Sequence, residues 1–239
     1  MYQPVMPDLA GPEGQRETPS PARVEAFSDG VFAIIITLLV LDLHVPRRDE
    51  LDGHSLAGVL LQQWPLYLSY ALSFLQVGVV WINHHTMFHY IQRSDHVLLF
   101  HNLMLLLCTA LVPFTTAIFA EYGLAIRSDI QVAAFIYSAA LGAAGIFFNL
   151  IWRHALSAHL VNSHADPNRL HALSWHWMFV PVFYGIAFVL TFVSPYLSVA
   201  TYALLLCYYA LPGPSMVRWM TGRRARRMKV LLGSRSRAS

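Results

Sequence analysis

The sequence contains few charged residues and few cysteines. Charged side chains make up only 12% of its 239 residues, whereas a soluble domain carries about a quarter. Its two cysteines, Cys108 and Cys207, each lie in an apolar stretch, so we expect small buried residues and no disulfide framework. Hydrophobic residues make up 56% of the chain, which indicates a membrane protein.

Signatures of several other protein classes are also missing. The sequence has no Gly-x-Ser-x-Gly turn, no spaced cysteine pair and none of the repeated histidine boxes of membrane di-iron enzymes. Residues 1–22 contain no apolar run, so we predict a disordered tail there and no secretory signal. These absences argue against an enzyme and against a bound cofactor.

Six apolar segments predict an all-α membrane protein with six transmembrane helices. The first could rise roughly 28 Å as a helix, enough to cross the hydrocarbon core of a bilayer. The second is longer than one crossing needs and contains Pro65, so its start is expected to be bent or interfacial. The segments run approximately over residues 27–45, 55–83, 96–120, 130–152, 172–193 and 196–211. We therefore predict one membrane domain at 23–212, followed by a basic tail at 213–239.

The fourth segment is rich in small residues. Ala134, Ser138 and Gly142 recur at every fourth position and share one helix face. This spacing lets another helix approach closely, although a loosely packed interior helix would have a similar composition.

The arginines fix the predicted orientation. An even number of spans places both termini on one side, and the arginines divide unequally between the two sides. The side of the termini would carry Arg16, Arg23, Arg93, Arg153, Arg169 and the basic tail, and the other side only Arg47, Arg48 and Arg127. By the positive-inside rule both termini are cytoplasmic.

The basic tail has two possible partners. The run from Arg223 to Lys229 could bind a nucleic acid, but no recognition fold accompanies it. Directly after a membrane span, it is better explained as a contact with anionic lipid head groups. We therefore expect membrane lipids as partners and no nucleic acid.

Polar residues gather at the predicted cytoplasmic ends of the first three helices. Side chains at membrane depth need hydrogen-bond partners, so a mutual network is the economical arrangement. For His89 and His96 we expect hydration among the lipid head groups instead. The predicted network consists of Arg23, Ser28, Asp29, Trp81, His84, His85, His101 and Asn102.

A metal site is the alternative for this histidine cluster. His84, His85, His89 and Asp29 are ligand types that metals accept. However, His84 and His85 are neighbours and point about 100° apart on a helix, so both would rarely face one ion. We predict no metal site.

An apolar stripe runs along the first segment. Ile34, Leu38 and Leu41 are spaced four and three residues apart, so they share one helix face. Copies of this stripe around an axis would form stacked apolar rings that block ions by dewetting. Alternatively, the stripe simply meets lipid or another helix.

The motifs in the first three segments resemble those of the transmembrane protein 175 family of potassium channels, the bacterial relatives of a lysosomal channel. The distinctive motif opens the first segment, and companion motifs close the second and lie in the third. The matching residues are Arg23, Phe27, Ser28, Asp29 and Gly30, then Trp81, His84 and His85, then His101 and Asn102.

This resemblance implies a function and an assembly. It implies a passive potassium-permeable channel in a bacterial or archaeal cell membrane, a homotetramer whose first helix lines the pore. The family pattern places the constriction at Ile34, Leu38 and Leu41, with Ile34 narrowest, and a potassium-preferring hydroxyl at Thr37. Like the family, the chain lacks the Thr-Val-Gly-Tyr-Gly filter, so weaker selectivity is expected. A secondary transporter or a proton-conducting carrier is the alternative, although no half-to-half match of broken helices is evident.

Overall fold

The computed structural model describes residues 19–51, 53, 55–122 and 127–210. Most of the predicted N-terminal tail and the whole basic tail from residue 213 lie outside the described residues. The described elements are α1 (Pro21–Leu38), η1 (Leu39–Asp42), η2 (Arg48–Leu51), α2 (Leu56–Gln62), α3 (Trp64–Phe88), α4 (His96–Ala110), α5 (Val112–Tyr122), α6 (Arg127–Ser157), α7 (Pro167–Met178), α8 (Val180–Val193) and α9 (Pro195–Ala210).

The predicted all-α membrane class is confirmed. Within the described part of the chain, five helical segments are long and apolar enough to cross a membrane: Pro21–Asp42, Trp64–Phe88, His96–Tyr122, Ser128–Ser157 and Pro167–Val193. The sixth predicted segment corresponds to α9, an apolar helix of 16 residues that is shorter than these five. The sixth crossing therefore stays a prediction.

Prolines explain where three of the apolar segments are interrupted. Pro65 stands in the first turn of α3 and separates it from α2, as predicted for this segment. Pro113 follows the break between α4 and α5, and Pro181 follows the break between α7 and α8. Proline lacks the N–H of a helical hydrogen bond and clashes with the preceding turn, so the helix restarts at each of these positions.

The first helix begins earlier and ends earlier than the apolar run. It starts at Pro21 instead of Phe27, because proline suits the first helical turn and polar residues can extend a helix beyond its apolar part. At the other end it tightens into the 3₁₀ turn η1, and Leu43 is already extended, so the helix stops before Val45.

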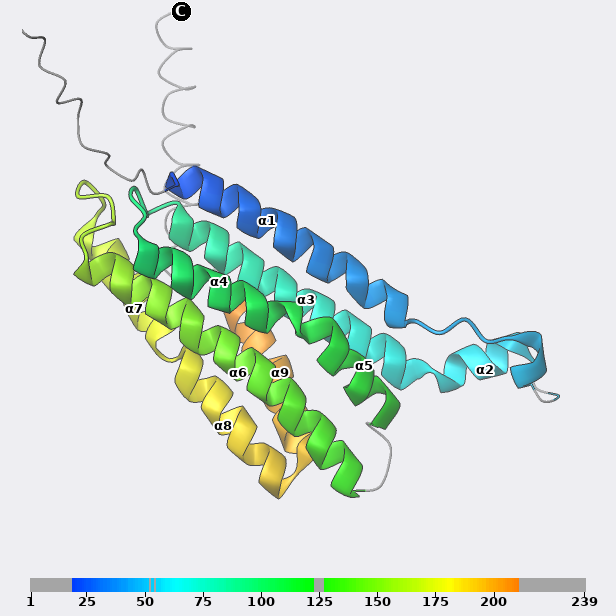
Figure 1. The fold of residues 1–239 in the computed structure, drawn as a ribbon. Helices are drawn as coiled ribbons and strands as arrows, with labels where there is room; N and C mark the ends of the chain where they lie inside the picture. Colours follow the sequence, from blue (N-terminus) through cyan, green and yellow to red (C-terminus); the bar gives the residue numbers. More distant parts are fainter. Residues whose placement is uncertain (1–18, 52, 54, 123–126, 211–239) are drawn as a thin grey trace, which may run out of the picture.

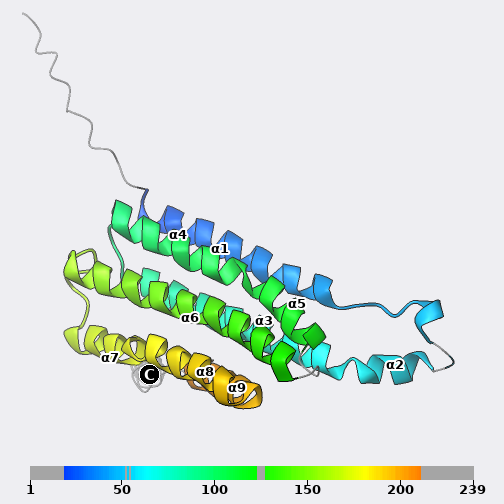
Figure 2. The same cartoon turned by 60° about the horizontal axis from the view of Figure 1, so that its bottom comes forward.

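The long helices form a two-row bundle (Figures 1 and 2). In one row α1, α3 and α9 lie side by side, and in the other α6 lies between α4 with α5 and α7 with α8. The start of α1 and the end of α9 point toward the same end of the bundle. Half of the α6 span is buried, more than of any other candidate span, so α6 is the centre of the packing.

Only some of the small residues predicted to let another helix approach α6 lie at such a contact. Ala134 and Ser138 are buried, and the Ser138 hydroxyl lies 3.5 Å from that of Ser198 on α9. A Cβ added at Gly142 would meet nothing within 4 Å, whereas one at Gly145 would lie 3.1 Å from Cγ1 of Val180. The close approach of α8 to α6 therefore depends on Gly145, three residues beyond the predicted stripe.

This contact predicts different effects for two glycines of the same helix. Gly145→Val should push into α8 and lower the free energy of unfolding by about 1–3 kcal/mol, the usual cost of overpacking. Gly142→Val should be tolerated, because space is open there. Thermal unfolding of the two purified variants in detergent measures the difference. Equal midpoints would show that Gly145 is not a required close contact.

Candidate pore helix and its polar network

Helix α1 has a buried face and an exposed face. Its buried residues are Val24, Ser28, Phe32 and Ile35, at helical spacings of four, four and three. On the other face the exposed fractions are 60% at Phe27, 60% at Ile34 and 43% at Leu38, and in the following turn η1 Leu41 is 74% exposed. The predicted apolar stripe thus lies on the outside of the subunit, where another copy, lipid or a pore can face it.

Three buried side chains from three helices form one hydrogen-bonded chain. The Asn102 amide on α4 donates to the hydroxyl of Ser28 on α1 at 2.9 Å, and Ser28 donates to the carbonyl of Val24 at 2.9 Å. Nε2 of His84 on α3 lies 2.9 Å from the Asn102 carbonyl oxygen. That oxygen can only accept, so His84 donates from Nε2. We call Ser28, His84 and Asn102 the buried triad.

Aromatic rings hold the imidazole of the triad in place. His84 stacks on Phe88 with ring centroids 4.4 Å apart, and Phe32 of α1 meets it edge-on at 5.4 Å. The His84 side chain is fully buried, and its Nδ1 has no hydrogen-bond partner among the described residues. Ring packing therefore adds to the Nε2 hydrogen bond in orienting this histidine.

Two further contacts join α1 to α3 nearer the surface. The indole N–H of Trp81 donates to the Asp29 carboxylate at 2.8 Å, and Nδ1 of His85 lies 2.8 Å from a carboxylate oxygen of Glu25. Glu25 was not among the predicted network residues. The sequence feature that places Glu25 near this cluster is its position four residues before Asp29, on the same helix face.

Two predicted network members lie elsewhere. Arg23 is exposed, and no ion pair with Asp29 forms between these two described residues. His101 faces α6, with its ring 6.0 Å from that of His154. It precedes Asn102 by one position and so points about 100° away from the triad. The predicted eight residues therefore do not form one network: six of them form the buried triad and two separate contacts between α1 and α3, and Arg23 and His101 take part in none of these described contacts.

His154 instead belongs to a carboxylate contact at the start of α4. Its Nε2 lies 2.8 Å from Oδ2 of Asp95, and Oδ1 of the same carboxylate accepts the backbone N–H of Leu98. Burial would raise the pKa of the Asp95 carboxyl, but these hydrogen bonds outweigh it and lower the pKa below its usual value. This contact caps α4 and fixes its start against α6.

Contacts within one subunit do not explain the roles predicted for Phe27, Gly30 and Thr37. Phe27 is exposed, and an added Cβ at Gly30 would meet nothing within 4 Å. Thr37 is exposed too, and its hydroxyl donates to the carbonyls of Ala33 at 3.0 Å and Ile34 at 2.9 Å. Its hydrogen is thus used within the helix, and its oxygen keeps its capacity to accept.

The described residues contain no cluster of three or more histidine, cysteine, aspartate or glutamate side chains that could hold a metal ion. His84 is buried whereas His85 is exposed. The two imidazoles therefore face different surroundings, as neighbours on a helix do.

The buried triad predicts that Asn102→Ala costs more folding stability than Trp81→Phe. Asn102→Ala leaves the buried N–H of His84 without an acceptor and should lower the free energy of unfolding by about 1–3 kcal/mol. Trp81→Phe removes a partly exposed hydrogen bond and should cost about 1 kcal/mol or less. Asn102→Leu combined with His84→Phe, which removes both partners, should recover part of the loss. Denaturant unfolding in detergent measures all three, and an Asn102→Ala variant as stable as Trp81→Phe would contradict the triad's role.

Known proteins resemble this chain over most of its length. The model of the family described as endosomal/lysosomal potassium channel TMEM175 matches residues 23–113, which include every motif residue named above. A protein from Chamaesiphon minutus named a potassium channel is 42% identical over 190 residues, covering 79% of this chain and 93% of that protein. One from Streptomyces collinus, also named a potassium channel, is 42% identical over 192 residues, covering 78% of this chain and 90% of that protein.

A solved structure agrees with these likenesses. The crystal structure of a homologue of the lysosomal potassium-selective channel TMEM175 from Chamaesiphon minutus matches with a TM-score of 0.72 and 39% identity. The match covers 80% of this chain and 96% of that one. Sequence and fold therefore agree along nearly the whole of these relatives, and the chain belongs to the TMEM175 family of potassium channels.

Proposed function

We propose that this protein is a potassium-permeable channel that conducts passively across a bacterial or archaeal cell membrane. The observation that carries the proposal is the exposed apolar face of α1, opposite the face that the buried triad fixes inside the subunit. The potassium-channel names of the two relatives, which this chain covers almost completely, support it. No cofactor is needed, and potassium is the permeant ion.

In the proposed assembly four subunits surround a central pore and α1 of each lines it. The exposed face of α1 then meets the axis, and Ile34, Leu38 and Leu41 form successive apolar rings. A ring of branched side chains excludes water from a narrow pore and so blocks ions without filling it. The exposed Thr37, one turn from Ile34, adds a ring of hydroxyl oxygens that favours potassium.

The rest of the chain has supporting roles in this proposal. Residues 23–212 form the channel domain, with the sixth crossing supplied by α9. The basic tail contacts anionic lipid head groups on the cytoplasmic side. A secondary transporter or proton carrier is the alternative, and flux through purified protein in liposomes separates them, because a carrier couples flux to a second substrate.

The constriction predicts how flux responds to a polar substitution. Ile34→Asn should ease wetting of the narrowest ring, raise potassium flux severalfold and weaken discrimination, because ions keep more of their water shell. Leu38→Asn should act in the same direction but less. The measurement is potassium flux from liposomes that contain the purified variants, after size-exclusion chromatography has verified the assembly of each.

Control positions for this experiment follow from burial. Ile35 points about 100° away from the stripe but is buried inside the subunit, so Ile35→Asn would destabilise the fold and is a poor control. Leu107 is an exposed apolar residue of α4, and Leu107→Asn should leave flux unchanged. No rise in flux at Ile34, or an equal rise at Leu107, would show that this face of α1 does not line the pore.

The orientation predicts which loops are reached from outside. In a variant without Cys108 and Cys207, a cysteine at Asp49 should react with an impermeant maleimide on intact cells. A cysteine at Ser163 should not react, because an even number of crossings separates it from the cytoplasmic termini. Both positions are exposed in the subunit. Labelling at Ser163 without labelling at Asp49 would reverse the proposed topology.

A further inference from the structure

Helix α1 ends in the 3₁₀ turn η1, whose last residue is Asp42. In the proposed topology this end faces the cell exterior, next to the ring formed by Leu41. We propose that Asp42 recruits cations to the outer mouth of the pore, so that four carboxylates raise the local potassium concentration there. This role rests on the proposed function, because it requires four subunits around one pore.

The Asp42 side chain lies beside the proposed apolar rings. Side chains three residues apart eclipse in a 3₁₀ helix, so Asp42 shares its face with Leu39 and points about 120° away from Leu41. Leu39 is fully buried, and η1 contacts α3 and α5, whereas Leu41 is exposed. A carboxylate in this position does not obstruct the pore, and it acts on ions through its electric field.

The Asp42 carboxylate has no partner within the described part of the subunit. Its Oδ2 is buried and has no hydrogen-bond partner there. Neither Arg47 nor Arg48, the nearest arginines in the sequence, forms an ion pair with it among the described residues. The residue as a whole is only half-buried, so ions from solution can approach it.

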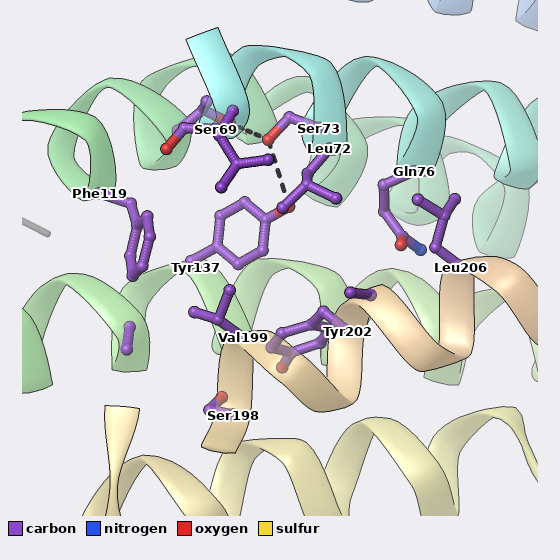
Figure 3. A pocket seen from close by; sticks show the side chains of 14 residues that line it. Ser69, Leu72, Ser73, Gln76, Phe119, Tyr137, Ser198, Val199, Tyr202 and Leu206 are labelled. Atoms are coloured by element: carbon purple, nitrogen blue, oxygen red, sulfur yellow. Dashed lines mark hydrogen bonds between the residues drawn. The ribbon is translucent and has the colours of Figure 1, made fainter. Parts of the chain in front are cut away.

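Hydroxyl groups of the neighbouring helices do not supply the missing partner. The serine and threonine hydroxyls of α3 and α5 all bond to other groups. One example lies beside the pocket between α3, α5, α6 and α9, where a chain of hydroxyls ends on a backbone carbonyl (Figure 3). The chain consists of Tyr137, Ser73 and Thr116, and it ends on Val112. Among the described residues, Asp42 therefore has no structural role as the acceptor of such a hydroxyl.

The end of a helix is an unfavourable place for an unpaired carboxylate. The last carbonyls of a helix give that end a partial charge of about −0.5, which attracts cations and repels anions. Asp42 adds a full negative charge here, and the last turn of η1 contains no basic residue. A cation from solution relieves this repulsion. Rings of aspartate attract ions in cation channels, and a charge at membrane depth commonly marks an ion pathway.

The range of this charge depends on the salt concentration. Consecutive Cα atoms are about 3.8 Å apart, so Asp42 lies within one Debye length, about 8 Å at physiological ionic strength, of the backbone that carries the Leu41 ring. Four carboxylates therefore attract potassium to the outer mouth in dilute salt. The Debye length falls to about 3 Å at 1 M, and the attraction is then screened.

Single-channel recording in planar bilayers at two salt concentrations tests this role. In about 20 mM potassium chloride, Asp42→Asn should lower the unitary conductance about threefold, and in about 1 M the variant and the unmodified protein should conduct equally. Asp42→Glu, which keeps the charge, should conduct like the unmodified protein at both concentrations. An unchanged conductance of Asp42→Asn in dilute salt, or an equal loss at both concentrations, would overturn the proposal.

Asp129 provides the matched control on the same proposed side of the membrane. It lies in the first turn of α6, where an acid suits the helix dipole, and its carboxylate accepts the hydroxyl of Ser128 at 3.1 Å. Helix α6 belongs to the other row of the bundle, so Asp129→Asn should leave the conductance unchanged in dilute salt. A loss as large as that of Asp42→Asn would show a general effect of surface charge and refute a specific role of Asp42.

Restoring the charge chemically separates an electrostatic role from a structural one. In a protein without Cys108 and Cys207, Asp42→Cys should conduct like Asp42→Asn. A negatively charged methanethiosulfonate reagent should return the conductance toward that of the unmodified protein, and a positively charged one should lower it further. Equal effects of the two reagents would contradict the proposal. Potassium flux through the unmodified protein tests the proposed function separately, because that flux persists if only the role of Asp42 is wrong.

Discussion

The hydrogen bonds of one amide, that of Asn102, determine how α1 sits in the subunit. It donates to Ser28 on α1 and accepts from His84 on α3, so three helices meet at one buried side chain. No water is available inside a bilayer to replace either bond, and both therefore form together or leave polar groups unsatisfied. Because Ser28 must face inward, the rotation of α1 about its axis is fixed, and Ile34 and Leu38 must face outward.

Because its rotation is fixed, the two faces of α1 have different roles. The inner face is attached to α3 and α4 by directional bonds and by the rings around His84. The outer face makes no such bonds, apart from the self-contained hydroxyl of Thr37. An apolar surface of this kind has no preferred partner of its own. In the proposed tetramer, its placement at the pore axis is thus a consequence of what the opposite face binds, and the polar motif acts on conduction without touching an ion.

Much of this arrangement could be predicted from the sequence, because the strong signals are local. Apolar length predicts the spans, and Pro65 predicts the bend at the start of α3. The spacing of Ser28, His84 and Asn102 near helix ends predicts their meeting. Periodicity shows which residues share a face, but not which neighbouring helix that face meets. The contacts of His101 with α6, of Glu25 with His85 and of Gly145 with α8 depend on that neighbour, so the sequence alone does not reveal them.

Helix α3 makes polar contacts at two levels of the subunit. Near one end His84 packs against Phe32 of α1 and bonds to Asn102 of α4, and eleven positions away, or about 16 Å along the axis of an α-helix, Ser73 contacts the hydroxyls of Thr116 on α5 and Tyr137 on α6. Between them α3 is an unbroken helix, with buried Gln76 and Val77 packed into the core. The hydrogen bonds of Ser73 attach this helix to α5 and α6, and those of His84 and Asn102 attach it to α4 and α1. The position of His84, and with it the rotation of α1, is therefore set by contacts at both levels of α3.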